Sequence, residues 1–273
     1  MNDFLQMIII GVVQGLTEFL PVSSSGHLVI FGDILGLNQK GIALEVFVHF
    51  GTLIAVFACF FKDIIQLFKQ LPHAIPHVLK KLPNTNDEEQ YRSMIIYIII
   101  SAFPAGIIGI FFKKHLEHVY HNLYVVFTCL IITGLILLSL RWSKKRPKKD
   151  FMNAKDSILI GFGQAFAILP GISRSGTTIS IAEALGLKSE LAAKFSFLMS
   201  IPVIAGATLL EVKDLLSEQI PSNEIVLYAV AMVSAAVSGF FAIKFLMELI
   251  RKQRMEYFAY YCFAVALFGL ISK

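Results

Sequence analysis

The chain has 273 residues, of which 56% are hydrophobic and 16% are charged, and it carries a formal net charge of +5. Soluble domains are about 45–50% apolar and about 25% charged, so this composition disfavours a soluble enzyme, a disordered protein and a nucleic-acid-binding protein. The cysteines Cys59, Cys129 and Cys262 lie in separate apolar runs without metal-ligand spacing, which argues against a disulfide scaffold or a thiolate site. The long apolar runs predict an integral membrane protein.

Six apolar stretches are long enough to cross a bilayer as a helix, which takes about 20 residues. They are the ranges 43–61, 93–112, 122–140, 192–212, 224–246 and 256–272. Two further apolar regions, 4–37 and 157–187, are each interrupted by a polar loop that contains a proline. We expect each to be a re-entrant helical hairpin, because irregular backbone at membrane depth is tolerated only inside protein or beside a wet cavity. One long kinked crossing is the alternative for each region.

Matching residues recur in the same order in the two halves of the chain. The pairs at an offset of 150 are Gln14 with Gln164 and Ser25-Gly26 with Ser175-Gly176, and those at an offset of 133 include Ser101 with Ser234 and Gly106 with Gly239. Constant offsets of this kind indicate a duplication. The predicted fold is therefore an all-α integral membrane protein with six transmembrane helices and two re-entrant hairpins. Its two repeats, 1–140 and 150–273, have inverted topology because each holds three crossings.

The basic residues support this topology. Most lysines and arginines fall in the loops 62–92 and 141–155 or near residues 188–194 and 251–254, which this topology places on one side of the membrane. The positive-inside rule makes that side cytoplasmic, so both chain termini and the first hairpin open to the outer side. Topology and anionic lipid thus account for the net charge without any nucleic acid.

Polar and ionisable side chains gather in the two interrupted regions, where they are expensive and mark function by default. Gln14 and Glu18 lie four residues apart and so share one helix face. The first loop adds Ser24 and His27, and the second adds Arg174. If the loops meet, these groups line one cavity, together with the loop residues Ser23, Ser25, Gly26, Ser173, Ser175 and Gly176 as substrate-binding candidates.

Such a cavity favours a diphosphate. Each Ser-Gly pair precedes a helix, whose N-terminus attracts anions, and the planar guanidinium of Arg174 suits phosphate oxygens. Glu18, with Gln14 beside it, is a candidate ligand for Mg²⁺ or Ca²⁺ shared with the phosphate, or alternatively a base or the orienter of His27. Ser24 could attack phosphorus while His27 takes its proton, and a directly activated water would serve equally well.

Each of these residues also has a structural interpretation. Glu18 and Arg174 could form a buried ion pair, His27 could be a hydrogen-bonded core residue, and the serines could be helix caps. Gln14 and Gln164 could have no role beyond cross-linking helices. Three further ionisable residues in apolar segments each stand alone and are interpreted as structural: His49, Glu183 and Glu211.

The motifs QGLTEFLPVSSSGH at 14–27 and LPGISRSG at 169–176 resemble those of the bacterial undecaprenyl-diphosphate phosphatases, also called bacitracin-resistance proteins. The resemblance implies interdigitated inverted repeats and a divalent cation. It also implies hydrolysis of a C55 isoprenoid diphosphate to the monophosphate that carries cell-wall precursors. The site would face outward from the bacterial cell membrane. The expected partners are this polyprenyl diphosphate and the membrane, with a second copy of the chain as a candidate for a homodimer.

The resemblance also implies residue roles. The family's acidic motif falls on Gln14 and Glu18, its serine and histidine fall on Ser24 and His27, and its essential arginine falls on Arg174. Many members carry a glutamate where this chain has Gln14, so Glu18 would act as the charged ligand alone. A polyprenyl-phosphate flippase or anion transporter is the alternative, because inverted repeats with broken helices are typical of transporters. The acid–base pair of Glu18 and His27 favours the enzyme.

Overall fold

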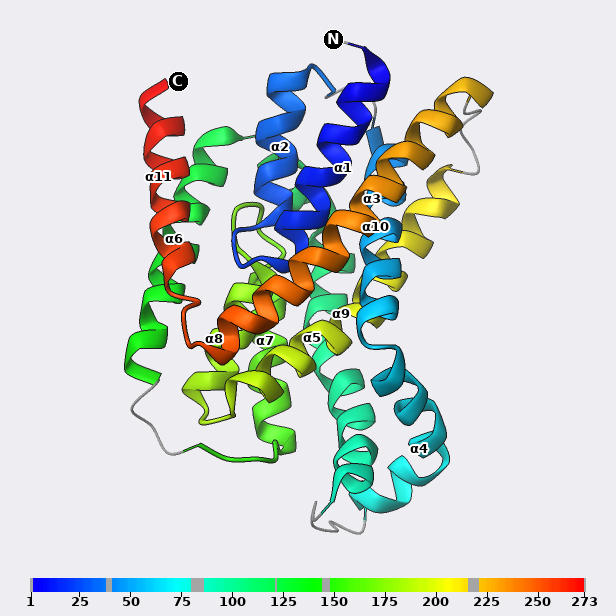
Figure 1. Ribbon diagram of the computed structural model, residues 1–273, viewed down its shortest axis with the longest axis vertical. Helices are drawn as coiled ribbons and strands as arrows, with labels where there is room; N and C mark the ends of the chain where they lie inside the picture. The colour runs from blue at the N-terminus through cyan, green and yellow to red at the C-terminus, as the bar shows by residue number, and fades with distance from the viewer. Residues whose placement is uncertain are drawn as a thin grey trace.

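The computed structural model describes residues 2–37, 41–79, 86–120, 122–143, 148–215 and 221–272, and these form helices with one isolated bridge between Lys149 and Leu187 (Figure 1). The helices are α1 (Asp3–Phe19), α2 (Ser24–Leu35), α3 (Gly41–Cys59), α4 (Phe61–Leu79), α5 (Asp87–Tyr120), α6 (Leu123–Ser143), α7 (Ala154–Phe166), α8 (Arg174–Ala184), α9 (Ser189–Leu215), α10 (Ser222–Arg251) and α11 (Tyr257–Ser272). The all-helical prediction is confirmed for these ranges.

The two interrupted apolar regions each form a pair of short helices. The pair α1–α2 has helices of 17 and 12 residues, and the pair α7–α8 has helices of 13 and 11 residues. At 1.5 Å per residue, helices of 11 to 13 residues are much shorter than the roughly 30 Å of a bilayer core. Figure 1 shows α1–α2 reaching inward from the end that carries both chain termini, and α7–α8 from the opposite end, so that their connecting loops meet inside the molecule.

Four helical segments in the described residues are long and apolar enough to cross a membrane: Asp87–Phe111, Leu123–Ser143, Ser189–Leu209 and Glu224–Arg251. They correspond to four of the predicted crossings. The predicted crossing at 43–61 ends in a bend of 81° between α3 and α4, and the bent pair counts as a fifth crossing if it is one broken span. The prediction at 256–272 corresponds to α11, whose 16 residues fall short of the length expected for a full crossing.

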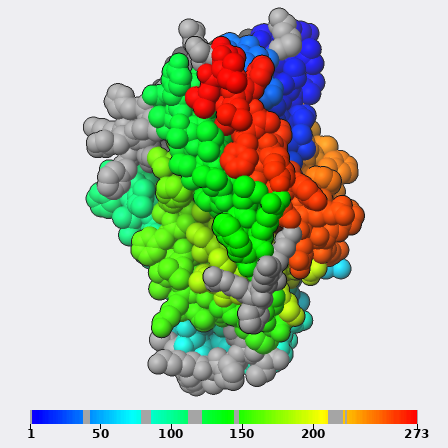
Figure 2. Space-filling view, turned by 90° about the vertical axis from the view of Figure 1, so that its left-hand side faces the viewer, coloured from blue at the N-terminus to red at the C-terminus, as the bar shows by residue number. Residues whose placement is uncertain are grey.

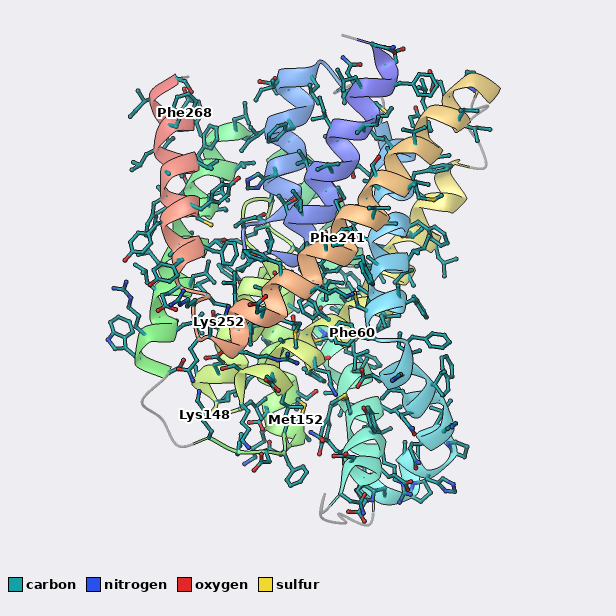
Figure 3. All side chains as sticks on the ribbon, viewed as in Figure 1. Phe60, Lys148, Met152, Phe241, Lys252 and Phe268 are labelled. Atoms are coloured by element: carbon teal, nitrogen blue, oxygen red, sulfur yellow. The ribbon has the colours of Figure 1, made fainter. Side chains whose placement is uncertain are left out.

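Large apolar side chains cover the outside of these helices. Phe241 on α10 and Phe268 on α11 are strongly exposed, as are Phe103 and Ile107 on α5, and Figure 3 shows Phe268 at the outer edge of the molecule. Figure 2 shows the face on which α11 and α6 lie side by side. Soluble proteins rarely expose so much contiguous apolar surface, so this exterior faces lipid and the protein is a multi-pass membrane protein.

Small residues let α1 approach its neighbours closely. The backbone of α1 lies against α10, where a Cβ atom added at Gly15 would lie 2.1 Å from Ser238 Oγ and 2.4 Å from the Ala235 carbonyl oxygen. On α3, a Cβ atom at Gly51 would lie 2.3 Å from the Met232 carbonyl oxygen of α10. Close backbone approach at small residues is how membrane helices gain packing energy without a hydrophobic driving force. The helix that carries Gln14 and Glu18 is thereby fixed in position.

We expect Gly15→Ala to lower stability by about 1–3 kcal/mol, because the added methyl group meets backbone atoms that cannot move aside. Thermal unfolding of the detergent-solubilised protein measures this loss. The matched control is Gly106→Ala on α5, since a Cβ atom there would meet nothing within 4 Å. Equal melting temperatures for the two variants would contradict the close packing of α1 on α10.

Candidate active site

The loops of the two hairpins contact each other directly. The backbone N–H of Gly171 donates to Ser23 Oγ at 3.1 Å, and Ser175 Oγ donates to the Leu20 carbonyl oxygen at 3.4 Å. Gly171 has a φ of 97°, and a Cβ atom there would lie 2.4 Å from a carbonyl oxygen of α6, so only glycine fits at this crossing. The two loops therefore meet, which was the condition for a shared cavity.

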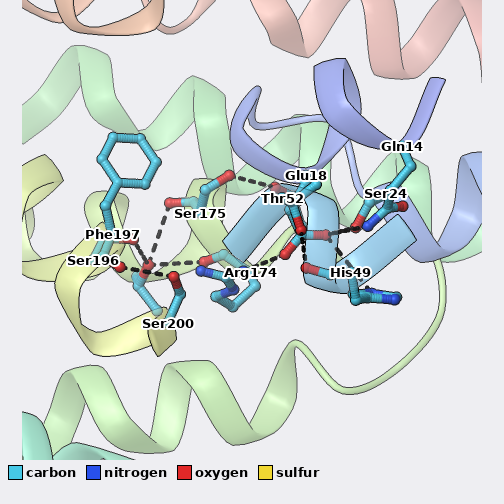
Figure 4. Close-up of polar contacts among 12 residues, drawn as sticks. Gln14, Glu18, Ser24, His49, Thr52, Arg174, Ser175, Ser196, Phe197 and Ser200 are labelled. Atoms are coloured by element: carbon cyan, nitrogen blue, oxygen red, sulfur yellow. Dashed lines mark hydrogen bonds and ion pairs between the residues drawn. The ribbon is translucent and has the colours of Figure 1, made fainter. Parts of the chain in front are cut away.

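Glu18 lies at the centre of this meeting point and is buried, with 7% of its surface exposed. Its Oε2 accepts hydrogen bonds from Ser24 Oγ at 2.6 Å and from Gln14 Nε2 at 3.0 Å, and its Oε1 forms an ion pair with Nη2 of Arg174 (Figure 4). The four residues come from α1, the first turn of α2 and the first turn of α8. The structure thus brings Gln14, Glu18, Ser24 and Arg174 together.

Two buried atoms of this cluster have no hydrogen-bond partner among the described residues. They are Oε1 of Gln14, which is fully buried, and Nη1 of Arg174, whose side chain is 15% exposed. A buried polar atom without a partner is costly, so such atoms mark where a ligand is expected. An amide oxygen can coordinate a cation, and a guanidinium N–H can donate a hydrogen bond to an anion. The two atoms without partners therefore fit a phosphate group with a bound metal ion.

The other loop serines act at the helix ends. Ser23 caps α2 by accepting from the Gly26 N–H at 3.3 Å, and Ser173 caps α8 by accepting from the Gly176 N–H at 3.0 Å. Each cap hydroxyl also lies 3.3 Å from a second hydroxyl, that of Ser25 in the first loop and of Ser175 in the second. These contacts match the capping interpretation, and the first residues of the two capped helices, Ser24 and Arg174, both contact Glu18.

Ser23 adopts a backbone conformation that residues other than glycine rarely take. Its φ is 70° and its ψ is 99°, which places it in the left-handed half of the map. Backbone strain of this kind costs about 1–3 kcal/mol and persists where the surroundings hold the chain in one geometry. Here the strained residue turns the chain so that Ser24, the next residue, directs its hydroxyl to Glu18.

His27 is buried on the side of α2 that faces α11. Its Nδ1 lies 2.8 Å from the Ser23 carbonyl oxygen, its Nε2 lies 2.8 Å from Tyr261 Oη, and the His27 and Tyr261 rings stack with centroids 5.7 Å apart. These contacts match the interpretation of His27 as a hydrogen-bonded core residue. The proton of the Ser24 hydroxyl is directed at Glu18 instead. A catalytic role for His27 stays a prediction.

His49 also belongs to this site, although the sequence alone led us to interpret it as a structural residue. It lies on α3 with its Nε2 at 3.9 Å from Glu18 Oε2, and its side chain is 30% exposed. The signal was in the sequence, since an ionisable residue inside the apolar run 43–61 is unusual at membrane depth. Glu183, by contrast, pairs with Lys148 at 4.0 Å and accepts from Ser143 at 3.3 Å, and the side chain of Glu211 lies outside the described residues.

A family model described as bacitracin resistance protein BacA matches residues 7–268. The chain belongs to the BacA family. An undecaprenyl-diphosphatase of Methanobrevibacter smithii is 41% identical to this BacA-family chain, over 97% of the chain and 96% of the relative. One from Halothermothrix orenii is 38% identical over 98% of each chain, and an undecaprenyl-diphosphatase 1 of Bacillus licheniformis is 37% identical over 98% and 99%.

The donor set of this BacA-family site is sparse for a metal ion. In the part of the chain that the structure describes, no group of three or more His, Cys, Asp or Glu side chains is arranged to hold one. Mg²⁺ commonly binds proteins through one or two carboxylates, keeps several waters and takes its remaining ligands from substrate phosphates. The Glu18 carboxylate and the orphaned Gln14 oxygen fit that mode of binding.

Proposed function

We propose that this BacA-family chain hydrolyses undecaprenyl diphosphate to undecaprenyl phosphate and inorganic phosphate, and so recycles the lipid carrier of cell-wall precursors. The observation that carries the proposal is the convergence of Ser24 and Arg174, each at the start of a helix, on the buried carboxylate of Glu18. The relatives named undecaprenyl-diphosphatase support it over nearly the whole chain. The family's description as a bacitracin resistance protein fits a reaction that consumes a diphosphate lipid.

In this proposal the diphosphate binds between the N-termini of α2 and α8. Arg174 Nη1, which has no partner among the described residues, donates to a phosphate oxygen and stabilises the charge that develops there. The isoprenoid tail stays in the lipid, against the apolar exterior. A divalent cation, when bound, is held by Glu18 and Gln14 and neutralises phosphate charge.

Either Ser24 or a water attacks the terminal phosphorus. With Ser24 as nucleophile, its Oγ forms a bond to phosphorus while the bond to the bridging oxygen breaks, and undecaprenyl phosphate leaves. Glu18 Oε2, at 2.6 Å from Ser24 Oγ, takes the proton, and a water then releases the phosphate from the serine. With water as nucleophile, the same carboxylate takes the proton from the water and no covalent intermediate forms.

We also propose the finer architecture of six crossings and two re-entrant hairpins in inverted repeats, 1–140 and 150–273. Equivalent contacts support it: Gly11 of α1 lies against Ser234 of α10, and Gly161 of α7 lies against Ser101 of α5. The first members of these pairs are 150 residues apart and the second members 133. The 17-residue difference between the two offsets is close to the 19 residues of α4, an extra helix in the first repeat.

The proposed orientation places the site on the outer side of the bacterial cell membrane. Lys148 and Lys252 lie in the half of the molecule away from both chain termini, as Figure 3 shows with Figure 1, and the positive-inside rule makes that half cytoplasmic. The first hairpin then opens outward. Association of two copies into a homodimer stays a prediction, which the molecular mass of the detergent-solubilised protein measures.

The test is phosphate release from undecaprenyl diphosphate by the purified, detergent-solubilised chain. We expect release that needs a divalent cation and that is faster with the C55 substrate than with shorter, soluble diphosphates. Release without a membrane gradient separates hydrolysis from transport. An absence of phosphate release, together with counterflow of polyprenyl phosphate in liposomes, would replace the phosphatase with the flippase.

A further inference from the structure

We propose that His49 supplies a nitrogen ligand to the divalent cation of this site. The inference rests on the proposed function and extends its metal site by one residue. Its starting point is the approach of His49 Nε2 to Glu18 Oε2 at 3.9 Å, from α3 to α1. Figure 4 shows His49 beside the Glu18, Ser24 and Gln14 cluster.

The imidazole of His49 is held by its other nitrogen. Nδ1 lies 2.8 Å from the carbonyl oxygen of Glu45, one turn earlier on α3. A carbonyl oxygen only accepts, so Nδ1 carries the hydrogen and Nε2 of the neutral ring presents its lone pair. Metal-binding histidines almost always donate their second ring N–H in this way, because the bond orients the ring and fixes its tautomer.

The gap between His49 Nε2 and Glu18 Oε2 suits a bound ion. At 3.9 Å it is longer than a hydrogen bond, and a neutral imidazole would face the carboxylate with two lone pairs opposed. Distances from Mg²⁺ and Zn²⁺ to their ligands are about 2.0–2.2 Å, so an ion of that size can bind both His49 Nε2 and Glu18 Oε2. The alternative is a protonated imidazole in an ion pair with Glu18. The 30% exposure of the His49 side chain leaves a route for an ion and its waters.

Gln14 provides a second and independent indication of a cation. Its amide nitrogen donates to Glu18 Oε2 at 3.0 Å, and its amide oxygen is buried without a partner among the described residues. A half-turn of the amide exchanges the two atoms, which removes the amide donor from Oε2 of Glu18 and directs the amide oxygen to the cation, while Ser24 Oγ still donates to Oε2. Because Gln14 brings no charge, the imidazole is the second strong donor. Imidazole suits Zn²⁺, Cu²⁺, Fe²⁺ and Ni²⁺, whereas Mg²⁺, Ca²⁺ and Mn²⁺ mostly bind oxygen ligands, so a nitrogen ligand on bound Mn²⁺ is a specific mark of His49.

The experiment uses the full chain in detergent with Mn²⁺ alone and no lipid substrate. Electron spin-echo envelope modulation detects the ¹⁴N of an imidazole bound to Mn²⁺. We expect this modulation in the wild type and in the control His73→Ala, which removes an exposed histidine of α4. We expect His49→Gln to abolish it and to weaken Mn²⁺ binding at least about tenfold. Adding Gln14→Glu to His49→Gln should restore affinity, but not the nitrogen signal.

Three results would overturn the proposal: wild-type protein that binds no Mn²⁺, bound Mn²⁺ without ¹⁴N modulation, or modulation that survives in His49→Gln. The last two would leave His49 as the ion-pair partner of Glu18. His49→Asn is the second variant if His49→Gln does not fold, and elution volume and melting temperature report folding. Phosphate release on the same samples tests the proposed function separately, because the spin-echo measurement needs no turnover.

Discussion

Arg174→Ala lowers the rate of phosphate release by at least about 100-fold, as the proposed site predicts. Its guanidinium binds Glu18 through Nη2, and its buried Nη1 has no partner among the described residues and is available to the substrate phosphate. Removing one preorganised donor to transition-state charge costs about 10²–10³ in rate at other active sites. Single-turnover phosphate release with saturating C55 diphosphate measures the effect on the chemical step, and titration of the lipid measures the effect on binding.

Two further variants control for charge and for folding. Arg174→Lys keeps the charge but loses the planar fork, so we expect only a small part of the activity to return. Arg251→Ala removes an exposed arginine that pairs with Glu190 at 3.2 Å on the surface, so we expect activity near that of the wild type. Near-normal turnover in Arg174→Ala, with Arg251→Ala as the reference, would contradict the assignment of Arg174 to the site.

The hairpins and their loops could be predicted because their signals are local. A proline and a Ser-x-x-Gly segment encode the end of one helix and the cap of the next, and the caps at Ser23 and Ser173 form as those segments predict. The convergence on Glu18 could be predicted only as a condition, because it depends on two loops meeting. That condition is met where the Gly171 N–H donates to Ser23 Oγ.

The features that were missed depend on tertiary contacts. His49 reaches Glu18 only because α3 packs beside α1, and apolar periodicity does not show which face of α3 that is. Tyr261 bonds His27 from 234 residues away, so a single sequence offers no signal for the pair. Helix α4, which follows α3 after a bend of 81°, was missed because the range 62–92 was interpreted as a loop.

Glu18→Gln separates the catalytic from the structural interpretation of the ion pair. The change keeps the shape of the side chain but leaves the Arg174 guanidinium, with its side chain 15% exposed, without a counter-charge. Breaking a buried pair from one side costs about 3–5 kcal/mol, so we expect a clear drop in melting temperature. We also expect phosphate release to fall at least about 100-fold, because an amide cannot take the proton that Ser24 Oγ directs at Oε2.

The double variant Glu18→Gln/Arg174→Gln decides between the two interpretations. Replacing both partners of a buried pair with neutral groups of similar shape is often neutral for stability, so we expect the melting temperature to recover. Activity should stay as low as in either single variant, because the double variant lacks both the proton acceptor, Glu18, and the hydrogen-bond donor to the substrate phosphate, Arg174. A pair that only held α1 to α8 would instead recover activity together with stability. Measuring melting temperature and phosphate release on the wild type, Glu18→Gln, Arg174→Gln and the double variant therefore assigns the pair, since only a catalytic role separates the two readouts.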